Sequence, residues 1–486
     1  MTKALSRARF DLYALGTRLS VTRLMAEECS YWADLDENLI GAVFRDVQDN
    51  DFGWIMLARD RIGRFRCIDT ECSFPSERQA MARLRLAIAE ASRCDLESAA
   101  AQGDEPNAPF DLLTVESGTA PTALHPYFRE LIERPGCAPA RAVIREIGPW
   151  LAPCDPHFVR EFQQHQFDQR LWELYLWAAF RELGFDVTHL EAPDFRLEAP
   201  GISFTVEATT VAPSTMGPLA THPDPKTQEE ITEFLANYMP LKYGSSLTSK
   251  LEKTNSRGEH YWETHEAKNK PFVLAIADFH KAATENEPAS MTFTQSALWQ
   301  YLYGQRVTWE RHDNQLVIVP EKVAEHKYGD KAVPSGFFDL ELARSVSAVL
   351  FSNAGTIAKF YRIGVLAGFA ADKHKYLRVG LRVNPDPNAA TGIPFHAYVG
   401  DSDYEEFWSD ELQVFHNPNA THPLPPKWFG GIAQHFFRDG DLHSFAPERS
   451  VLSSYTVLMH VTDDLGRDSS DDKEASPPKA REAHFE

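Results

Sequence analysis

The sequence predicts a multidomain protein of the α+β / α/β class. Its 486 residues exceed the roughly 100–200 residues of one domain, which indicates two to four domains. Hydrophobic residues make up 43% of the chain and aromatic residues 12%, which is enough to build sizeable cores. Segments with the alternation of strands are interspersed with segments that have the spacing of helices, so both kinds of element are expected.

Residues 1–94 are expected to form a small α-β-β-β-α module. Residues 20–34 have helical spacing, and a capping box beginning at Ser76 predicts a last helix that runs to Ala91. Between them lie three β-prone segments separated by turn residues, at 39–46, 53–60 and 64–71. This order is similar to that of small nucleic-acid-binding modules, and it suits an assembly module equally well.

Composition divides the remainder of the chain. Residues 95–140 are expected to be a linker or connection, because 95–124 is rich in Ala, Gly, Pro, Ser and acidic residues. A core is expected over 141–325, and a C-terminal α/β region, either separate or continuous with that core, over 326–462. The acidic tail, 463–486, has almost no apolar residues and is expected to be disordered.

No uninterrupted apolar stretch approaches the ~20 residues of a membrane-spanning helix, since the densest, Leu174 to Phe180, has seven. The N-terminus lacks the apolar core of a secretory signal, so we expect a cytoplasmic protein that does not contact membranes. The six cysteines contain no C-x-x-C pair, and we expect reduced, mostly buried thiols.

The formal net charge of −21 opposes indiscriminate binding of nucleic acid. Residues 358–383 nevertheless contain six basic residues and one acidic residue, a local charge of +5, with aromatic residues interleaved. Such a surface suits nucleic-acid binding, although a basic strand pair on a solvated sheet face is an equal alternative. The candidate nucleic-acid-binding residues are Lys359, Arg362, Lys373, Lys375 and Arg378.

The most informative region begins with a helix expected over 168–183, which ends before Gly184. Within Leu171–Phe180 the only charged residue is Glu173. A helix that is apolar on nearly every face is buried, and a lone buried carboxylate is costly unless it is paired or binds a metal. A salt bridge to Arg170 or to a distant base is the structural alternative for Glu173.

Two further acidic residues follow, Asp194 between two β-prone segments and Glu207 on the second of them. Residues 185–192 and 202–211 are expected to be strands, and Pro193-Asp194 and Pro200-Gly201 break the chain between them. Because side chains alternate across a strand, Glu207 and Thr209 are expected to share one face.

This order of helix glutamate, strand, Pro-Asp, hairpin and strand glutamate resembles the PD-(D/E)XK, or restriction-endonuclease-like, nuclease superfamily. The resemblance covers about residues 165–280 and implies a central mixed sheet flanked by helices. It implies that Asp194, Glu207 and the Ala208 carbonyl are ligands of Mg²⁺ (or Mn²⁺), and that Glu173 binds a second ion or a water. Carboxylates are the hard ligands that Mg²⁺ needs for phosphodiester hydrolysis.

The sequence departs from this pattern at one position. Where the superfamily has a lysine, this chain has Thr209, which carries no charge and cannot orient water as an ammonium group can. Either another lysine has taken its place or the site no longer cuts. Lys250 is the favoured replacement, on the helix expected before the buried strand at 271–278.

The resulting hypothesis is a metal-dependent nucleic-acid phosphodiesterase, with DNA favoured over RNA, and a role in genome defence or a mobile-element system by analogy. Its candidate catalytic residues are Glu173, Asp194, Glu207, Thr209 and Lys250. The alternative is a catalytically inactive, nuclease-like module that binds nucleic acid, a protein partner or a second copy of itself. A scaffold protein with purely structural acidic residues is a third interpretation.

Overall fold

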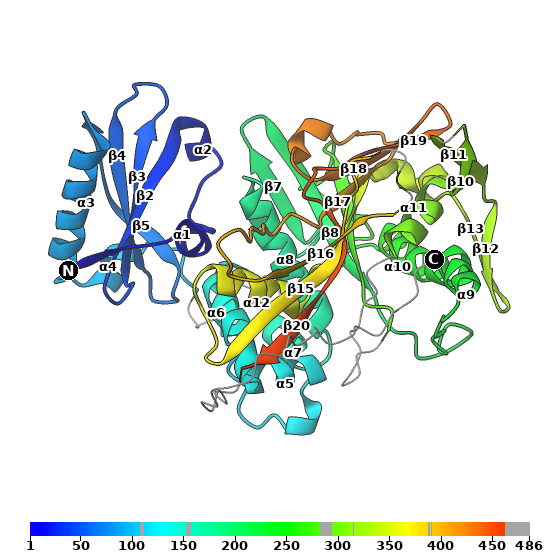
Figure 1. Ribbon diagram of the computed structural model, residues 1–486, viewed down its shortest axis with the longest axis horizontal. Helices are drawn as coiled ribbons and strands as arrows, with labels where there is room; N and C mark the ends of the chain where they lie inside the picture. Colours follow the sequence, from blue (N-terminus) through cyan, green and yellow to red (C-terminus); the bar gives the residue numbers. More distant parts are fainter. Residues whose placement is uncertain are drawn as a thin grey trace, which may run out of the picture.

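A computed structural model of the protein describes residues 1–106, 111–151, 157–281, 294–313, 315–386, 389 and 391–461. The fold is mixed α+β, with helices and several sheets (Figure 1), which confirms the predicted class at this level. No helix within those ranges is long and apolar enough to cross a lipid bilayer. The disorder predicted for 463–486 concerns residues outside them.

An antiparallel sheet in the order β1-β2-β3-β4-β5 forms the N-terminal part, drawn in blue in Figure 1. Its strands are β1 (Thr2–Ala4), β2 (Ala26–Asp34), β3 (Leu39–Asp46), β4 (Phe52–Arg59) and β5 (Phe65–Phe74). The accompanying helices are α1 (Arg7–Ala14), α2 (Thr22–Met25), α3 (Glu77–Ala91) and α4 (Leu96–Ala100). Leu84 of α3 packs on one face and Phe10 of α1 on the other, since successive strand residues point to opposite faces.

The α-β-β-β-α order predicted for residues 1–94 is therefore partly wrong. The three predicted strands and the last helix are present as β3, β4, β5 and α3, although the Ser76 side chain makes no capping hydrogen bond. The helix predicted over 20–34 is instead the short α2 followed by strand β2. Because β2 lies between β1 and β3 and pairs with both, ladder hydrogen bonds outweigh the weak helical spacing of its sequence.

The prediction of a linker over residues 95–140 is wrong for the second half of this range. That half contains α5 (Pro126–Glu133) and the start of α6 (Ala138–Ile147), and α7 (Phe158–Gln163) follows. The side chains of Phe128 and Leu131, three residues apart on α5, are fully buried in the main core. The amphipathic helix α5 therefore packs into the main core, although it lies within a stretch rich in Pro and Ala.

The central feature is a mixed sheet in the order β19-β18-β17-β14-β9-β8-β7-β6. Its strands are β6 (Asp186–His189), β7 (Phe195–Ala199), β8 (Ile202–Val211), β9 (Phe272–Asp278), β14 (Ala348–Phe351), β17 (Gln413–His416), β18 (Ala433–Arg438) and β19 (Asp441–Phe445). The run β8, β9, β14 is parallel, whereas β6, β7 and β8 form an antiparallel meander. Because the sheet joins strands from 141–325 and 326–462, these two regions are continuous.

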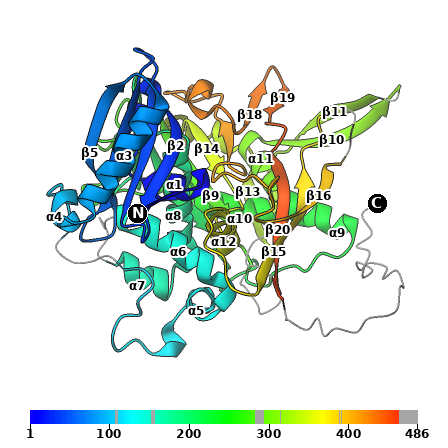
Figure 2. The ribbon, with the colours of Figure 1, turned by 60° about the vertical axis from the view of Figure 1, so that its left-hand side comes forward.

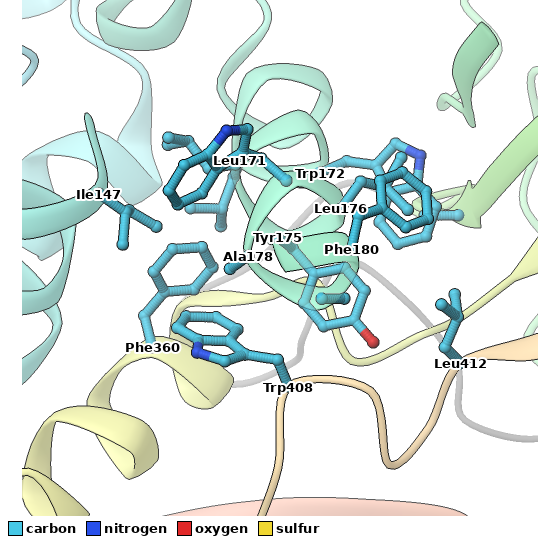
Figure 3. Packing of buried hydrophobic residues seen from close by; sticks show 14 of the residues in the cluster. Ile147, Leu171, Trp172, Tyr175, Leu176, Ala178, Phe180, Phe360, Trp408 and Leu412 are labelled. Atoms are coloured by element: carbon cyan, nitrogen blue, oxygen red, sulfur yellow. The ribbon is translucent and has the colours of Figure 1, made fainter. Parts of the chain in front are cut away.

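Helix α8 (Phe167–Glu182) packs on one face of this sheet, within the core that Figure 3 shows. Trp172 and Tyr175 of α8 lie in this core with Phe360 and Trp408, whose ring centroids are 5.1 Å apart. The other face carries a second core, formed with α10 (Met239–Glu252) and α11 (Gln295–Tyr303). The central strands β9 and β14 are therefore buried on both sides, as their continuous apolar sequences require.

The elements predicted around the acidic residues agree closely with the structure. Helix α8 and strands β8 and β9 match the segments expected at 168–183, 202–211 and 271–278. The chain leaves α8 at Gly184, whose φ of +95° is a left-handed conformation that glycine adopts without strain. Strand β6 is shorter than the expected 185–192 because the chain turns after His189.

The remaining elements lie around this sheet. A sheet in the order β16-β15-β20 contains β15 (His374–Arg382), β16 (Ile393–Tyr398) and β20 (Val451–His460), and α12 (Ile357–Leu366) precedes it. Hairpins are formed by β10 (Gln305–His312) with β11 (Gln315–Lys322), which extends outward in Figure 2, and by β12 (Glu325–Tyr328) with β13 (Lys331–Pro334). Helix α9 (Gln228–Glu233) and the π-helical turn η4 (Phe234–Tyr238) lead into α10. Short 3₁₀ turns are η1 (Pro121–Ala123), η2 (Pro135–Cys137), η3 (Gly148–Leu151), η5 (Tyr261–Glu263), η6 (Phe337–Asp339), η7 (Leu342–Ser345) and η8 (Pro426–Phe429).

The expectation of mostly buried thiols is wrong for the cysteines that the structure describes. Four of them are exposed, Cys29, Cys67, Cys72 and Cys94, and one, Cys137, is buried. None of these five is in a disulfide.

Candidate active site

A pocket of about 740 Å³ lies where α8, the β6–β7 turn, β8 and α10 meet. Its lining includes Glu173, Asp194, Glu207 and Lys250, four of the five predicted catalytic residues. These side chains come from separate elements, so the fold alone brings them together. Thr209 is not among the described residues that line the pocket.

Two hydrogen bonds connect Asp194 to neighbouring residues of β8, one to Glu207 and one to Ala208. The backbone N–H of Asp194 donates to Glu207 Oε2 at 3.3 Å, and the backbone N–H of Ala208 donates to Asp194 Oδ2 at 2.7 Å. Asp194 immediately precedes β7, which pairs with β8 so that Phe195 lies opposite Val206. The register of this hairpin therefore sets the two carboxylates side by side.

Lys250 provides the positive charge nearest to this pair. Its Nζ donates to Glu207 Oε1 across 43 residues of sequence. The side chain of Glu207 is 3% exposed and that of Lys250 is 20% exposed, so the ion pair is largely shielded from water. The structure thus brings Lys250, the residue favoured as a replacement for the missing lysine, to the second acidic residue. Thr209 is 6% exposed on the same strand and makes no comparable contact with the carboxylates.

Glu173, on α8, also lines the pocket and is fixed by residues of its own helix. Arg170 Nη1 donates to its two carboxylate oxygens at 3.2 and 3.0 Å, and Gln169 Nε2 donates at 3.1 Å. Gln169 also accepts a hydrogen bond of 3.0 Å from Thr210 Oγ1, which connects α8 to β8. The alternative that Glu173 pairs with Arg170 is therefore realised, yet its carboxylate still faces the pocket.

Burial and mutual repulsion dominate the electrostatics of the acidic residues. Burial, followed by the charge of Asp194, raises the pKa of Glu173 to about 7 and the pKa of Glu207 to about 8. Burial lowers the pKa of Lys250, but the carboxylates of Glu207 and Asp194 outweigh it and hold that pKa above its usual value. Additional positive charge in the pocket would favour the ionised form of both glutamates.

A divalent cation would provide such charge, and the oxygen donors present are those that Mg²⁺ prefers. Mg²⁺ typically binds through one or two carboxylates together with water, so Asp194 and Glu207 suffice in donor type and number. Within the described ranges, no group of three or more His, Cys, Asp or Glu residues is arranged to hold a metal ion.

Sequence reasoning missed several residues of the pocket. His189, at the end of β6, places Nε2 4.0 Å from Glu173 Oε2, and Gln169 and Thr210 orient that same glutamate. Gln169 lies four residues before Glu173 on a helix, a spacing that predicts contact. His189 had no signal in the sequence, because its approach depends on how β6 packs against α8.

Three of the six basic residues at 358–383 are buried, so the stretch does not form the continuous basic surface that the sequence suggested. Lys359, Arg362 and Arg378 are 0%, 3% and 3% exposed, so their assignment to nucleic-acid binding is wrong. Lys359 and Arg362 lie on helix α12 and Arg378 lies on strand β15, so these residues do not form a basic strand pair. Lys373 and Lys375 are exposed.

Two buried glutamates explain this burial. Lys359 Nζ lies 2.8 Å from both Glu406 Oε1 and Glu411 Oε2, and Arg362 Nη2 lies 2.8 Å from Glu406 Oε1. Arg378 contacts Glu411. Three cations and two carboxylates therefore form an internal network, which removes most of the local positive charge from the surface.

Comparison with known proteins adds no assignment, since no protein-family model, curated protein or solved structure matches this chain.

Proposed function

We propose that this protein is a divalent-metal-dependent nucleic-acid phosphodiesterase with a divergent PD-(D/E)XK site. The observation that carries the proposal is the shared pocket of Asp194, Glu207 and Lys250, contributed by the β6–β7 turn, β8 and α10. The element order α8, β6, β7, β8, α10, β9 supports a restriction-endonuclease-like core. Lys250 would replace the motif lysine, whose position in this chain is occupied by Thr209.

Each residue has a role that follows from its position. Asp194 and Glu207 would hold the cation, together with the Ala208 carbonyl that the resemblance implies. Bound Mg²⁺ or Mn²⁺ supplies Lewis-acid chemistry, because it neutralises charge developing on the phosphate and lowers the pKa of a coordinated water. Lys250 orients Glu207 and presents an ammonium group to the pocket. Glu173, held by Arg170 and Gln169, faces the same space and can accept a hydrogen bond from water.

Nuclease assays with matched variants test this proposal. We would compare the cleavage rates of four proteins: wild type, Asp194→Asn, Glu207→Gln and Glu198→Gln. The substrates are single- and double-stranded DNA and RNA, each with Mg²⁺, Mn²⁺ or EDTA. Removal of either pocket carboxylate should lower the cleavage rate by about 100-fold or more, the scale seen when one electrostatic catalytic group is lost. Glu198, on β7 in an ion pair with Arg196 and outside the pocket, is the control. Equal cleavage by all four proteins would show that a contaminant cuts and would reject the assignment.

An inactive, nuclease-like binding module is the second candidate, and the uncharged Thr209 favours it. Thr209→Lys separates the two, because Thr209 shares the strand face of Glu207. Cleavage gained only in this variant would indicate a degenerate site. If wild type cleaves nucleic acid and Lys250→Met does not, Lys250 has taken over the role of the motif lysine. The preference for DNA and a role in genome defence are part of the proposal and rest on the resemblance alone.

A further inference from the structure

Aromatic rings form one side of the same pocket. His125 caps α5, Tyr127 lies in its first turn, and Phe167 begins α8. The rings of His125 and Phe167 are stacked, with centroids 5.4 Å apart and planes 13° from parallel. Tyr127 completes the group, with its ring centroid 5.8 Å from His125 and 6.4 Å from Phe167. We call these three residues the aromatic wall.

The aromatic wall is held by backbone hydrogen bonds and by the core. The backbone N–H of His125 donates to the Gln163 carbonyl at 2.9 Å, and the backbone N–H of Tyr127 donates to His125 Nδ1 at 3.3 Å. Phe167 is 1% exposed and anchors the group in the main core, whereas His125 and Tyr127 are partly exposed. Two rings therefore reach the pocket in fixed positions, which reduces the entropy lost when a planar ligand stacks on them.

Other residues of the pocket lining are charged. They include Glu207, Lys250 and Lys253, and the Lys253 Nζ lies 5.5 Å from the ring centroid of Tyr261, which also lines the pocket. A ligand that contacts both the aromatic and the basic residues has a planar aromatic part and an anionic part. A nucleotide has this composition, and a pocket of about 740 Å³ lies within the range of about 300–1,000 Å³ typical of small-ligand sites.

A base inside a duplex is paired and stacked, so its face cannot reach a side chain inside a pocket. We propose that the pocket takes an unpaired nucleotide of a single-stranded nucleic acid, with its base on the aromatic wall and its phosphate toward Lys250 and the carboxylates. This inference rests on the proposed function, because it names the substrate class of that same site.

Binding measurements test the inference without relying on cleavage. Fluorescein-labelled single-stranded DNA and the matching blunt duplex are titrated with the full chain in Ca²⁺. The single strand should bind at least about 10-fold more tightly. Tyr127→Ala should weaken single-strand binding by about 5- to 150-fold, the fold-change that corresponds to loss of one base–aromatic stack. Tyr127→Phe keeps the ring and should bind within about twofold of wild type, since stacking does not use the hydroxyl.

Tyr455→Ala is the control, because Tyr455 is 60% exposed on β20 and lies outside the pocket. A second measurement uses wild type only, so it does not depend on whether Tyr127→Ala folds. An abasic site moved along the oligonucleotide should weaken binding at one position and have little effect elsewhere.

The outcomes separate the two proposals. Duplex that binds as tightly as single strand, an abasic scan without a sensitive position, or equal binding by Tyr127→Ala and Tyr455→Ala would overturn the inference. Ring-dependent binding of single strands without cleavage in Mg²⁺ or Mn²⁺ would support the inference and reject the phosphodiesterase. Carboxylate-dependent cleavage of duplex as fast as single strand would support the phosphodiesterase and overturn the inference.

Discussion

Replacing Lys250 with methionine removes the ammonium group that neutralises Glu207 and keeps a side chain of similar length. In the variant, the nearest remaining donor to the Glu207 carboxylate is the Asp194 N–H, 3.3 Å away. Breaking a buried ion pair by removing one partner costs about 3–5 kcal/mol. Because Lys250 is 20% exposed, we expect the lower end, about 3 kcal/mol, when Glu207 is ionised.

The cost should depend on pH. Burial and Asp194 raise the pKa of Glu207 to about 8, and loss of Lys250 removes the main opposing charge. Below that pKa, at about pH 6, the carboxyl group of the variant is protonated, so only a hydrogen bond of about 1 kcal/mol is lost. At about pH 9 the variant must either bury an ionised Glu207 without its counter-ion or keep Glu207 protonated against the pH, and either way the full loss of about 3 kcal/mol applies.

Urea unfolding in EDTA at both pH values measures these changes, provided that the m-value is unaffected. Lys268→Met is the matched control, since Lys268 is exposed, does not line the pocket and should change stability by less than about 0.5 kcal/mol. The double variant Lys250→Met/Glu207→Gln should recover part of the loss at the higher pH. A Lys250→Met effect that is the same at both pH values and no larger than the control would refute the interpretation of Lys250 as the counter-ion of Glu207.

Three further predictions concern stability. The contribution of Glu207 to the unfolding free energy of the metal-free protein should fall as the pH rises from about 5 to about 8, because its raised pKa makes this carboxyl group bind more protons in the folded state than in the unfolded chain. The difference in unfolding free energy between wild type and Glu207→Gln, measured in urea, should therefore decrease over this range, and a difference that increases would contradict the reasoning. Glu406→Gln removes a carboxylate that contacts all three cations of the internal network, so it should lower the unfolding free energy by about 3–5 kcal/mol. Glu405→Gln, at the exposed neighbouring residue, should lower it by less than about 0.5 kcal/mol. Similar urea midpoints for the two variants would count against the network. Gly364→Ala should lower the unfolding free energy by about 1–3 kcal/mol through overpacking, because the added Cβ would lie 2.5 Å from the Pro139 carbonyl oxygen where α12 meets α6. An unchanged thermal midpoint would show that the two helices can move apart without a loss of stability.

Local signals predicted the elements that carry the site. Helix α8 combines a long apolar run with a glycine at its end, and β8 and β9 are dense in β-branched and apolar residues, so their limits were predicted to within one residue. Strand β2 shows where local signals fail. Its sequence has helical spacing, but pairing with β1 on one side and β3 on the other decides its conformation.

The sequence by itself determined the fold class, the strands and helix that carry the acidic residues, and the order and spacing of Glu173, Asp194 and Glu207. Only the tertiary structure decided which charges meet. It pairs Glu207 with Lys250, 43 residues away, and it buries Arg362 against Glu406, 44 residues away, where composition suggested an exposed basic surface. The physical reason is that helix and strand signals act over a few residues, whereas ion pairing and burial depend on contacts that exist only after the chain has folded.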